Sequence, residues 1–487
     1  MATTAKVLGY LPQDKPPFGK MLLLGFQHVL TMFPATVLCA FLMHFDVSTV
    51  LTITGFGTIV SLVGAYLSIK TYIPLYYGSS FAYIAAVTTI MSQIEPGLAY
   101  GQVAKPETIS IITAGFICTG IINILVGLLV RVTGGKKGLD KILPPEITGP
   151  VAMIIGLGLA FTAIQMASGA WWNQDYANTT ASLIPASIFI PETAVLLKWW
   201  CASLLTFLAA VLFSVYLQGK GFIGMLPILL ALIFGYIISI PLGLVKLDAI
   251  FVSEAFRLPT FVLPTFNSTY TASVLFGVGI MAIATLPEST AHLYQISLYV
   301  DHLAEEQGRE KPNLARFIGL NLMLDGLNDL VNGLFGSTAG TNYGENNSLM
   351  VITRNYSGVA LISAGAIAIL LGFSGTLFDI VYSIPTAVVG GLAIYLYGVI
   401  GVQGIALMMA EKVDLFDPGK LALVAVILVI GLGGSIGYNG SLPIPLLKSV
   451  FPSGWPAIAT AAVFGILLNL VFVFIKPPKV RATDVLQ

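Results

Sequence analysis

Long apolar runs separated by short polar segments extend through almost the whole chain. A run of about 20 mostly apolar residues is long enough to cross a bilayer as a helix. Fourteen such segments lie near residues 21–43, 48–69, 74–94, 108–130, 144–168, 198–217, 222–243, 271–297, 314–334, 343–354, 356–377, 382–409, 420–437 and 456–475. The pattern therefore predicts an all-α polytopic membrane protein.

Two of these segments, the third and the tenth, are interrupted by residues that hydrocarbon disfavours. The third contains Gly78-Ser79-Ser80, and the tenth contains GENNS from Gly344 to Ser348. Irregular backbone at membrane depth is tolerated only where it is buried in protein or lines a cavity. The two segments are seven apart, and paired interruptions of this kind point to a midplane binding site in secondary transporters. We expect a substrate cavity there, with the N-terminal end of the half-helix after Glu345 facing it.

Fourteen segments divide into two halves of seven. An odd number per half makes the second half enter the membrane from the opposite side, which gives an inverted repeat. An offset of 241 residues aligns Pro144 with Pro385 and Gly149 with Gly390. This match is in keeping with a repeat, although Gly and Pro are common in membrane helices.

Composition and charge support the membrane assignment and predict an orientation. Of the 487 residues, 56% are hydrophobic and 9% are charged, whereas soluble domains carry about 25% charged residues. With a cytoplasmic N-terminus, 18 of the 23 Lys and Arg fall on the cytoplasmic side. The positive-inside rule therefore predicts cytoplasmic tails at 1–20 and 476–487 in a plasma (inner) membrane protein. The zero net charge gives no sign of a nucleic-acid partner, and the three cysteines suggest packing residues.

Four acidic residues fall inside the predicted spans, namely Glu288, Asp325, Asp329 and Glu345. A charged residue inside a span costs at least about 2.5 kcal/mol and is by default a functional hypothesis. Glu288 and His292 are four apart and share one helical face, and Pro287 is expected to loosen the helix beside them. A structural hydrogen-bonded pair is the alternative reading of these two residues.

The ninth segment carries a polar stripe that is expected to face the protein interior. Asn321, Asp325, Asn328 and Asn332 follow one another at spacings of 4, 3 and 4. Such a stripe can hold neighbouring helices together or contact substrate. Phe81 leaves a similar choice open, because most membrane phenylalanines only pack, but it directly follows the interrupting Gly-Ser-Ser.

Buried acids with a neighbouring histidine suggest a proton-coupled mechanism. Desolvation disfavours the charged form of a carboxylate, so the site can hold a proton that a histidine shares. Proton and substrate would then strengthen each other's binding. Carboxylates without a buried cation suit a neutral ligand rich in N–H donors, and a flanking aromatic suits a flat ring. No phosphate-binding loop or nucleophile–base set appears, so we expect no enzyme, no cofactor and no metal.

Several motifs then carry a family resemblance. They are DKPPF at 14–18, GFQHVLTMF at 25–33, YGSSFAYI at 77–84, PESTAHL at 287–293, FGSTAGTNYGENNSLMVITRNYS at 335–357 and YGVIGVQGI at 397–405. The chain resembles the nucleobase–ascorbate transporters (nucleobase–cation symporter family 2), and within them the bacterial uracil permeases. The family signature begins with Gln, Glu or Pro before Asn and ends in Thr plus Arg or Lys. Here it reads ENNSLMVITR, from Glu345 to Arg354.

The resemblance implies a specific architecture. It implies fourteen spans in a seven-plus-seven inverted repeat, with short strands in segments three and ten. A core domain, 21–130 and 271–377, would move against a gate domain, 144–243 and 382–475. Family members usually form homodimers.

Carried over residue by residue, the resemblance also implies a site. Glu288 and Glu345 correspond to the two carboxylates that bind the nucleobase, and Phe81 to the aromatic that packs on the ring. Gly344 matches a backbone contact, and Ala35 lies where the first span approaches the ligand. His292 corresponds to the histidine tied to proton coupling, and Asp325 corresponds to an acid in the ninth span of purine-transporting members. Together with Glu288, these two residues are the candidates for proton coupling.

The first residue of the signature is the clue to specificity. Uracil permeases tend to have Glu there, purine transporters Gln and ascorbate transporters Pro, so Glu345 favours uracil. The expected coupling ion is the proton, and sodium is the alternative. The chain departs from the family pattern at Ser348, where the signature usually has Gly, at Pro287 and Ser289 beside Glu288, and at Asp325 and Asp329 in the ninth segment. Together these departures keep a wider pocket that takes xanthine or urate as an alternative. A third reading, an anion exchanger, predicts a basic residue in the site where the sequence has acids.

Overall fold

The fold is mostly helical and is known here from a computed structural model. It describes residues 9–98, 101–133, 143–169, 171–172, 188–189, 193–245, 247, 250 and 252–475. The expected C-terminal tail, the first eight residues of the expected N-terminal tail and most of the loop at 170–192 lie outside these residues. Within them, nine helices are long and apolar enough to cross a membrane. The chain is therefore a polytopic membrane protein, as the apolar pattern predicted.

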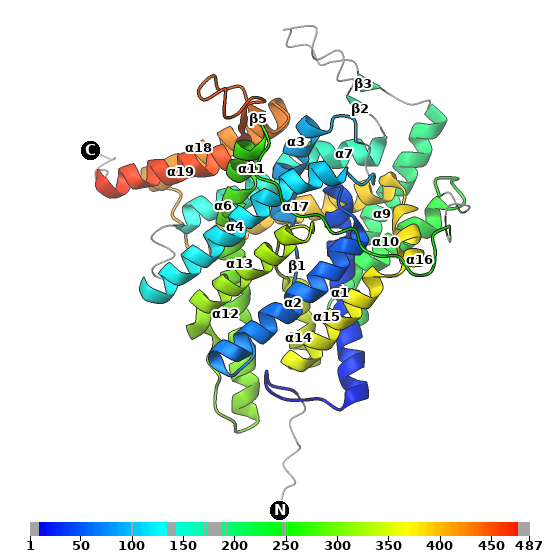
Figure 1. Cartoon of the computed structure of the whole chain (residues 1–487), viewed down its shortest axis with the longest axis vertical. Coiled ribbons are helices and arrows are strands. Elements are labelled where there is room, and N and C mark those ends of the chain that lie inside the picture. The colour runs from blue at the N-terminus through cyan, green and yellow to red at the C-terminus, as the bar shows by residue number, and fades with distance from the viewer. Residues whose placement is uncertain are drawn as a thin grey trace, which may run out of the picture.

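The long apolar helices come from both halves of the chain (Figure 1). They are α1 (Phe18–Leu42), α2 (Val47–Ile69), α4 (Pro106–Thr133), α6 with α7 (Pro145–Gly158 and Ala160–Ser168), α9 (Thr193–Tyr216), α11 with α12 (Thr271–Gly277 and Ala282–Glu306), α17 (Thr386–Ala410), α18 (Pro418–Gly437) and α19 (Ala457–Phe474). Shorter apolar helices are α3 (Ile84–Ile94), α10 (Pro227–Ser239) and α15 (Gly358–Gly372). The more polar α13 (Ile318–Leu334) and α14 (Gly344–Thr353) and the connector α16 (Gly375–Tyr382) complete the set.

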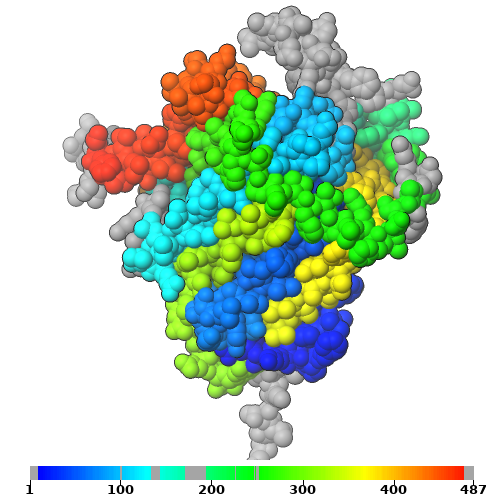
Figure 2. Space-filling model, viewed as in Figure 1, coloured from blue at the N-terminus to red at the C-terminus, as the bar shows by residue number. Residues whose placement is uncertain are grey.

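Helices from the two halves alternate in one layer. In the space-filling view, α4, α13, α2 and α15 run side by side as cyan, yellow-green, blue and yellow ridges (Figure 2). Glycines allow the close approach: a Cβ on Gly120 of α4 would lie 2.7 Å from the carbonyl oxygen of Gly326 of α13. Small residues at such contacts let helix backbones pack tightly in a membrane.

Two short strands lie in the middle of the molecule (Figure 1). Strand β1 (Tyr77–Ser79) pairs antiparallel with β4 (Gly340–Asn342), and Tyr77 is opposite Asn342. Both strands are buried on every residue. The expectation of short strands in the two interrupted segments is confirmed. Outside this pair, β2 (Trp171–Trp172) pairs with β3 (Ile188–Phe189), and β5 (Ser441–Leu442) pairs with β6 (Trp455–Pro456).

Two helices differ in detail from the expected spans. The fifth segment, predicted near 144–168, is found as one span made of two helices, because a break at Leu159 separates α6 from α7. The eighth was expected to loosen at Pro287, yet α12 is continuous through it. The irregular turn, η4 (Gly279–Met281), comes before α12 begins. Because proline removes a bond to the preceding turn, the backbone before Pro287 is where the adjustment falls.

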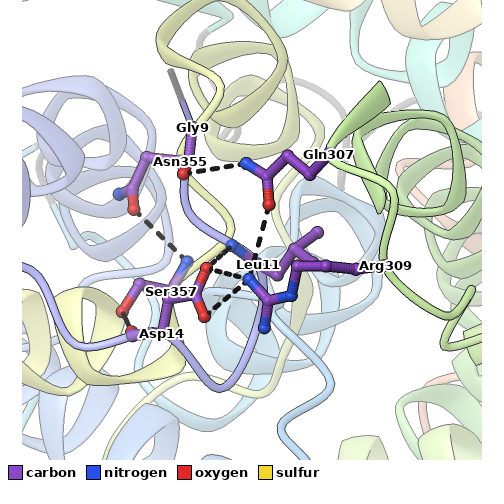
Figure 3. A network of polar contacts seen from close by, with 7 residues as sticks. All are labelled: Gly9, Leu11, Asp14, Gln307, Arg309, Asn355 and Ser357. Carbon is purple, nitrogen blue, oxygen red and sulfur yellow. Dashed lines mark hydrogen bonds and ion pairs between the residues drawn. The ribbon is translucent and has the colours of Figure 1, made fainter. Parts of the chain in front are cut away.

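The N-terminal segment from residue 9 packs as a strap on one end of this layer (Figure 3). Arg309, just beyond α12, donates from Nη1 to both carboxylate oxygens of Asp14, at 2.9 and 2.7 Å. Tyr10 donates its backbone N–H to Arg354 O at 2.9 Å, and its own carbonyl accepts from Tyr356 at 2.8 Å. The strap therefore joins the ends of α12 and α14 to the start of α1.

Candidate substrate site

The paired strands bring two helix N-termini together at the centre of the fold. After β1 the chain turns at Ser80 into η1 (Phe81–Tyr83) and α3, and after β4 it turns at Tyr343 into α14. Tyr343 fixes the crossing, since its hydroxyl donates to Ser79 O at 2.9 Å and lies 2.9 Å from Thr36 Oγ1. A Cβ on Gly78 would come within 2.3 Å of the Tyr343 ring. Glycine is needed in β1 for this reason.

Glu288 of α12 and Glu345 of α14 stand on either side of this centre. Both side chains are exposed, although most of their helix neighbours toward the strands are buried. The two carboxylates interact electrostatically with each other, and Glu288 also interacts with His292. Glu345 lies in the first turn of α14, where the helix dipole favours a negative charge. The structure thus brings together the two carboxylates that the sequence singled out.

His292 connects α12 to β4. Its Nδ1 lies 2.9 Å from the backbone oxygen of Asn342 and 2.8 Å from the side-chain Oδ1 of Asn342. Because both partners are acceptors, this nitrogen carries the hydrogen, and Nε2 is the free nitrogen of the neutral ring. A Cβ on Gly344 would lie 2.9 Å from Nε2. His292 therefore presents Nε2 to the start of α14.

The orientation of Asn342 is held by a second layer of polar groups that sequence reasoning did not assign. Its Nδ2 donates to Ser289 Oγ at 2.6 Å, and Asn321 Nδ2 donates to the same oxygen at 2.9 Å. All three side chains are fully buried. Asn321 belongs to the expected stripe on α13, but only the fold reveals that the stripe reaches His292. No local spacing relates these residues.

The whole stripe faces the interior, as expected. Asn321, Asp325 and Asn328 are 0% exposed, and Asn332 is 1% exposed. Neither carboxyl oxygen of Asp325 is in a hydrogen bond within the described part of the chain. The groups it interacts with are Asp329, Ser289 and Glu288. Asp325 is thus behind the exposed carboxylates and electrostatically connected to Glu288.

The three remaining site candidates are half-buried. Phe81 is the first residue of η1 and packs against the apolar core, as Ala35 of α1 does. Gly344 is the first residue of α14. Helix α1 contacts β1, α3 and α14, and His28 of α1 accepts a hydrogen bond on its carbonyl from Asn346 Nδ2 at 3.1 Å. The first span thereby approaches the half-helix, and Phe81 begins the other half-helix.

Exposed side chains form a stripe along each of the two helices that carry the carboxylates. The stripe includes Glu288, Ala291, Gln295, Leu298 and Tyr299 on α12 and consists of Glu345, Ser348 and Ile352 on α14. Both stripes run toward the helix ends on which the N-terminal strap packs (Figure 3). The exposed carboxylates are therefore continuous with exposed positions leading to that side of the molecule.

A cavity of about 1030 Å³ begins close to the other half-helix. Its lining includes Ile84 and Ala85, three and four residues after Phe81, together with Tyr397 of α17 and Tyr438 after α18. Neither carboxylate lines it. The cavity is next to the candidate site and is not the site itself. Among the residues that the structure describes, no three His, Cys, Asp or Glu side chains gather in a way that could hold a metal ion.

Comparison with known proteins adds relatives along the full length of the chain. The model described as "Permease family" matches residues 19–439. The uracil permease of Bacillus caldolyticus is 32% identical over 464 residues, which cover 94% of this chain and 93% of the relative. The uracil permease of Escherichia coli (strain K12) is 32% identical over 465 residues, covering 95% and 94%. A putative pyrimidine permease of Escherichia coli (strain K12) is 30% identical over 481 residues, covering 96% and 94%.

Solved structures that resemble the fold are more distant in sequence. The transmembrane domain of the cyanobacterial bicarbonate transporter BicA matches with a TM-score of 0.54 at 15% identity, covering 95% of this chain and 98% of that one. SLC26A9 matches with a TM-score of 0.62 at 13% identity, covering 94% and 66%. At such identities the likeness concerns the fold alone.

Proposed function

The chain belongs to the permease family, and from that premise we propose that it takes up a nucleobase, uracil, across the plasma membrane together with protons. The uracil permeases named above match this chain over nearly their whole length, so it is a transporter and not an enzyme. The substrate, the coupling ion and the movement are the parts that we propose.

The observation that carries the proposal is the pair of exposed carboxylates, Glu288 and Glu345, at the N-terminal end of a half-helix. Uracil is a neutral flat ring with two N–H donors and two carbonyl acceptors. Carboxylate oxygens accept N–H bonds, and the free backbone N–H groups that begin α14 at Gly344 suit a carbonyl. Phe81 and Ala35 supply the half-buried apolar surfaces against which a ring can pack.

Proton coupling would use the acidic groups of the site and the histidine beside them. Glu288 interacts with both His292 and Glu345, and Asp325 interacts with Glu288. A proton on this set removes like-charge repulsion between the carboxylates, and that lets a neutral base bind more tightly. By linkage, bound base then holds the proton more tightly. Sodium is the alternative coupling ion, and the uptake assay described below distinguishes it from the proton.

Helix packing supports a core domain that moves against a gate domain. Extensive contacts join α4 with α13 and α2 with α15, and others join α9 with α10, α18 with α19, and α6 with α17. If each helix is replaced by the one seven segments away in the chain, the pair α4 and α13 becomes α15 and α2. In the same way, the pair α9 and α10 becomes α18 and α19. This is the relation expected of two inverted repeats of seven spans. We therefore keep 21–130 with 271–377 as core and 144–243 with 382–475 as gate.

Basic residues support a cytoplasmic location for the strapped side. Lys70 O accepts from Gln13 of the strap at 2.9 Å, and Lys20 lies over the Tyr10 ring at 4.9 Å. Arg309 and Arg354 lie at the same end. Under the positive-inside rule this end is cytoplasmic, and the exposed stripes of α12 and α14 then make the site inward-facing. We also propose that the transporter works as a homodimer, by analogy with the family.

A purine, xanthine or urate, is the second candidate within the same family. Ser348 is exposed one turn beyond Glu345, on the face that would meet substrate. Its hydroxyl donates to Gly344 O at 3.1 Å and can still accept an N–H of a larger ring. An anion exchanger would share the fold of the bicarbonate transporter. It is disfavoured because the site presents two carboxylates, which repel an anion.

Uptake of labelled uracil into proteoliposomes tests the proposal. An inward proton gradient at constant sodium should drive accumulation above equilibrium, and collapsing the gradient should abolish it. Uptake that equilibrates without concentrating would retain the base and refute the coupling. Competition by unlabelled xanthine and urate separates the two classes of base, and stimulation by sodium alone would assign the other ion.

A further inference from the structure

Asp329 is a buried carboxylate with a different environment from the others. It lies in the second half of α13 and is 0% exposed. Its Oδ1 accepts the backbone N–H of Gly340 at 2.8 Å, and its Oδ2 accepts Nδ2 of Asn123, in α4, at 3.0 Å. One carboxylate thereby joins α13 and α4 to the first residue of β4. Charge-assisted hydrogen bonds of this kind are stronger than neutral ones.

Asp325, one turn earlier on the same helix, is the contrast. Neither of its oxygens is in a hydrogen bond within the described residues, whereas each oxygen of Asp329 accepts an N–H donor that cannot itself accept in return. An acceptor that faces donors is suited to a fixed role. A carboxyl that faces one hydroxyl, that of Ser289, and no fixed N–H donor is suited to carrying a proton.

The strand that Asp329 holds leads directly to the substrate site. Gly340 is pressed against β1, where an added Cβ would lie 2.2 Å from Gly78 O. Only four residues separate Gly340 from Glu345, and the far end of β4 is tied to His292 through Asn342. The strand is thus anchored at both ends, by Asp329 at Gly340 and by His292 at Asn342. A shift at the first anchor would be transmitted to the carboxylate of Glu345.

We propose that Asp329 is a positioning residue: it holds β4 in register so that Glu345 stands at the site opposite Glu288, and it does not carry the transported proton. The inference rests on the proposed function for its transport readout. Its structural readout, the mobility of β4 and α14, does not depend on any substrate.

The neighbouring asparagine makes a sharp test possible. Asn123 Oδ1 is buried and has no hydrogen-bond partner within the described residues. In Asp329→Asn, the new Oδ1 still accepts from Gly340, and a turn of the Asn123 amide lets its free oxygen accept from the new Nδ2. In Asp329→Ala, by contrast, the N–H of Gly340 and the amide of Asn123 are both left buried and unpaired, which is costly. The two variants should therefore differ strongly.

Hydrogen exchange on the full chain in lipid nanodiscs gives the structural readout. We expect Asp329→Ala to raise the exchange rates of the amides of β4 and of the first turn of α14 at least tenfold. Asp329→Asn should stay within about threefold of wild type. Exchange in Asp329→Ala that matches wild type would overturn the positioning role, whatever the substrate proves to be.

Uptake in proteoliposomes gives the functional readout. Asp329→Ala should raise the half-saturation for uracil at least tenfold, and Asp329→Asn should retain most of the proton-driven accumulation. Asp325→Asn, the same chemical change one turn away, should lose accumulation. If Asp329→Asn loses proton-driven accumulation to the same extent as Asp325→Asn, Asp329 is a proton carrier and the inference is wrong. Failure of wild type to take up uracil would instead count against the proposed function, and exchange would still decide the inference.

A second pair of variants covers the case in which Asp329→Ala does not fold. Asn123→Asp alone sets two carboxylates against each other and should lower uptake and loosen β4. Adding Asp329→Asn to it restores a donor that faces an acceptor, with the charge moved to α4. Rescue of exchange protection and of uptake by the double variant supports the positioning role, and absence of rescue contradicts it.

Discussion

At the scale of single residues, the two exposed carboxylates are the least expected feature of so apolar a chain. Glu288 and Glu345 come from helices far apart in sequence, yet they interact with each other and neither has an ion pair with Lys or Arg among the described residues. Two acids that interact without a cation between them favour a shared proton or a ligand that donates hydrogen bonds. The half-helix N-terminus offsets part of the repulsion.

Replacing Glu345 with Gln tests which of its two properties, charge or acceptor geometry, recognises the base. The amide loses one acceptor and adds a donor, so an N–H of uracil meets a donor and a charge-assisted bond is lost. Such bonds contribute about 1.5–3 kcal/mol, so the half-saturation for uracil should rise about tenfold to a hundredfold. Competition by xanthine should improve, because the new donor suits a purine carbonyl. Initial rates of labelled uptake measure both effects.

The matched control for this change is Glu305→Gln, which alters an exposed acid near the end of α12. Glu305 is exposed and pairs with Lys311 at 2.8 Å. Its replacement should leave the half-saturation for uracil within about twofold. Unchanged uracil uptake in Glu345→Gln would remove Glu345 from the site.

At the scale of elements, the sequence predicts what periodicity and composition encode. The apolar runs predict the long helices, and the polar stripe of α13 predicts its buried face. Gly78-Ser79-Ser80 and Gly344 to Ser348 predict the interruptions, because such residues cannot continue a helix through hydrocarbon. The resemblance adds the pairing of the two strands, which no local pattern contains.

Contacts between distant segments are what the sequence does not encode locally. The hydrogen bonds that Asn342 Nδ2 donates to Ser289 and that His292 Nδ1 donates to both oxygens of Asn342 link residues about 50 positions apart. Asp329 follows Asn328 of the polar stripe but is not part of it, and only the fold reveals that its carboxylate contacts β4 and α4. The break at Leu159 likewise has no proline or polar run to mark it.

The N-terminal strap is an element whose stability can be tested by itself. Asp14 accepts the Leu11 N–H at 2.8 Å as well as the Arg309 guanidinium, and this pairing raises the pKa of Arg309. The pair is partly exposed, so its loss should cost only about 1 kcal/mol. In Asp14→Ala, hydrogen exchange at Tyr10 and Tyr356 should therefore rise about fivefold.

Asp14→Asn is the matched variant for the strap. Its oxygen still accepts from Leu11, but the charge that faces Arg309 is lost, so exchange should rise less than in Asp14→Ala. High salt should reduce the difference between wild type and Asp14→Asn, since exposed ion pairs are screened. Identical exchange in all three proteins would mean that the backbone bonds of Tyr10 alone hold the strap.

At the scale of the whole molecule, the question is which surfaces slide when the site changes sides. The proposed core and gate meet where α11 touches α19 and β6, and where α12 touches α6. Phe276 at the end of α11 packs on Phe451 and Trp455 with ring centroids 5.2 and 5.7 Å apart. This contact lies beside the cavity that adjoins Phe81, so the movement of one domain against the other would have to alter it.

A disulfide across this contact should stop transport. A Cβ on Gly277 would lie 3.1 Å from Pro456 Cβ, close to the spacing of about 3.5–4.5 Å that a disulfide needs. We expect oxidised Gly277→Cys/Pro456→Cys to lose at least nine tenths of proton-driven uracil uptake in proteoliposomes and to regain it with reductant.

The control is Gly158→Cys/Ser435→Cys, at the same Cβ spacing of 3.1 Å but within the gate. Its oxidation should leave uptake unaffected if the gate moves as one body. A fully cross-linked Gly277–Pro456 pair that still concentrates uracil would mean that α11 and α19 move together, and the division into core and gate would then be wrong.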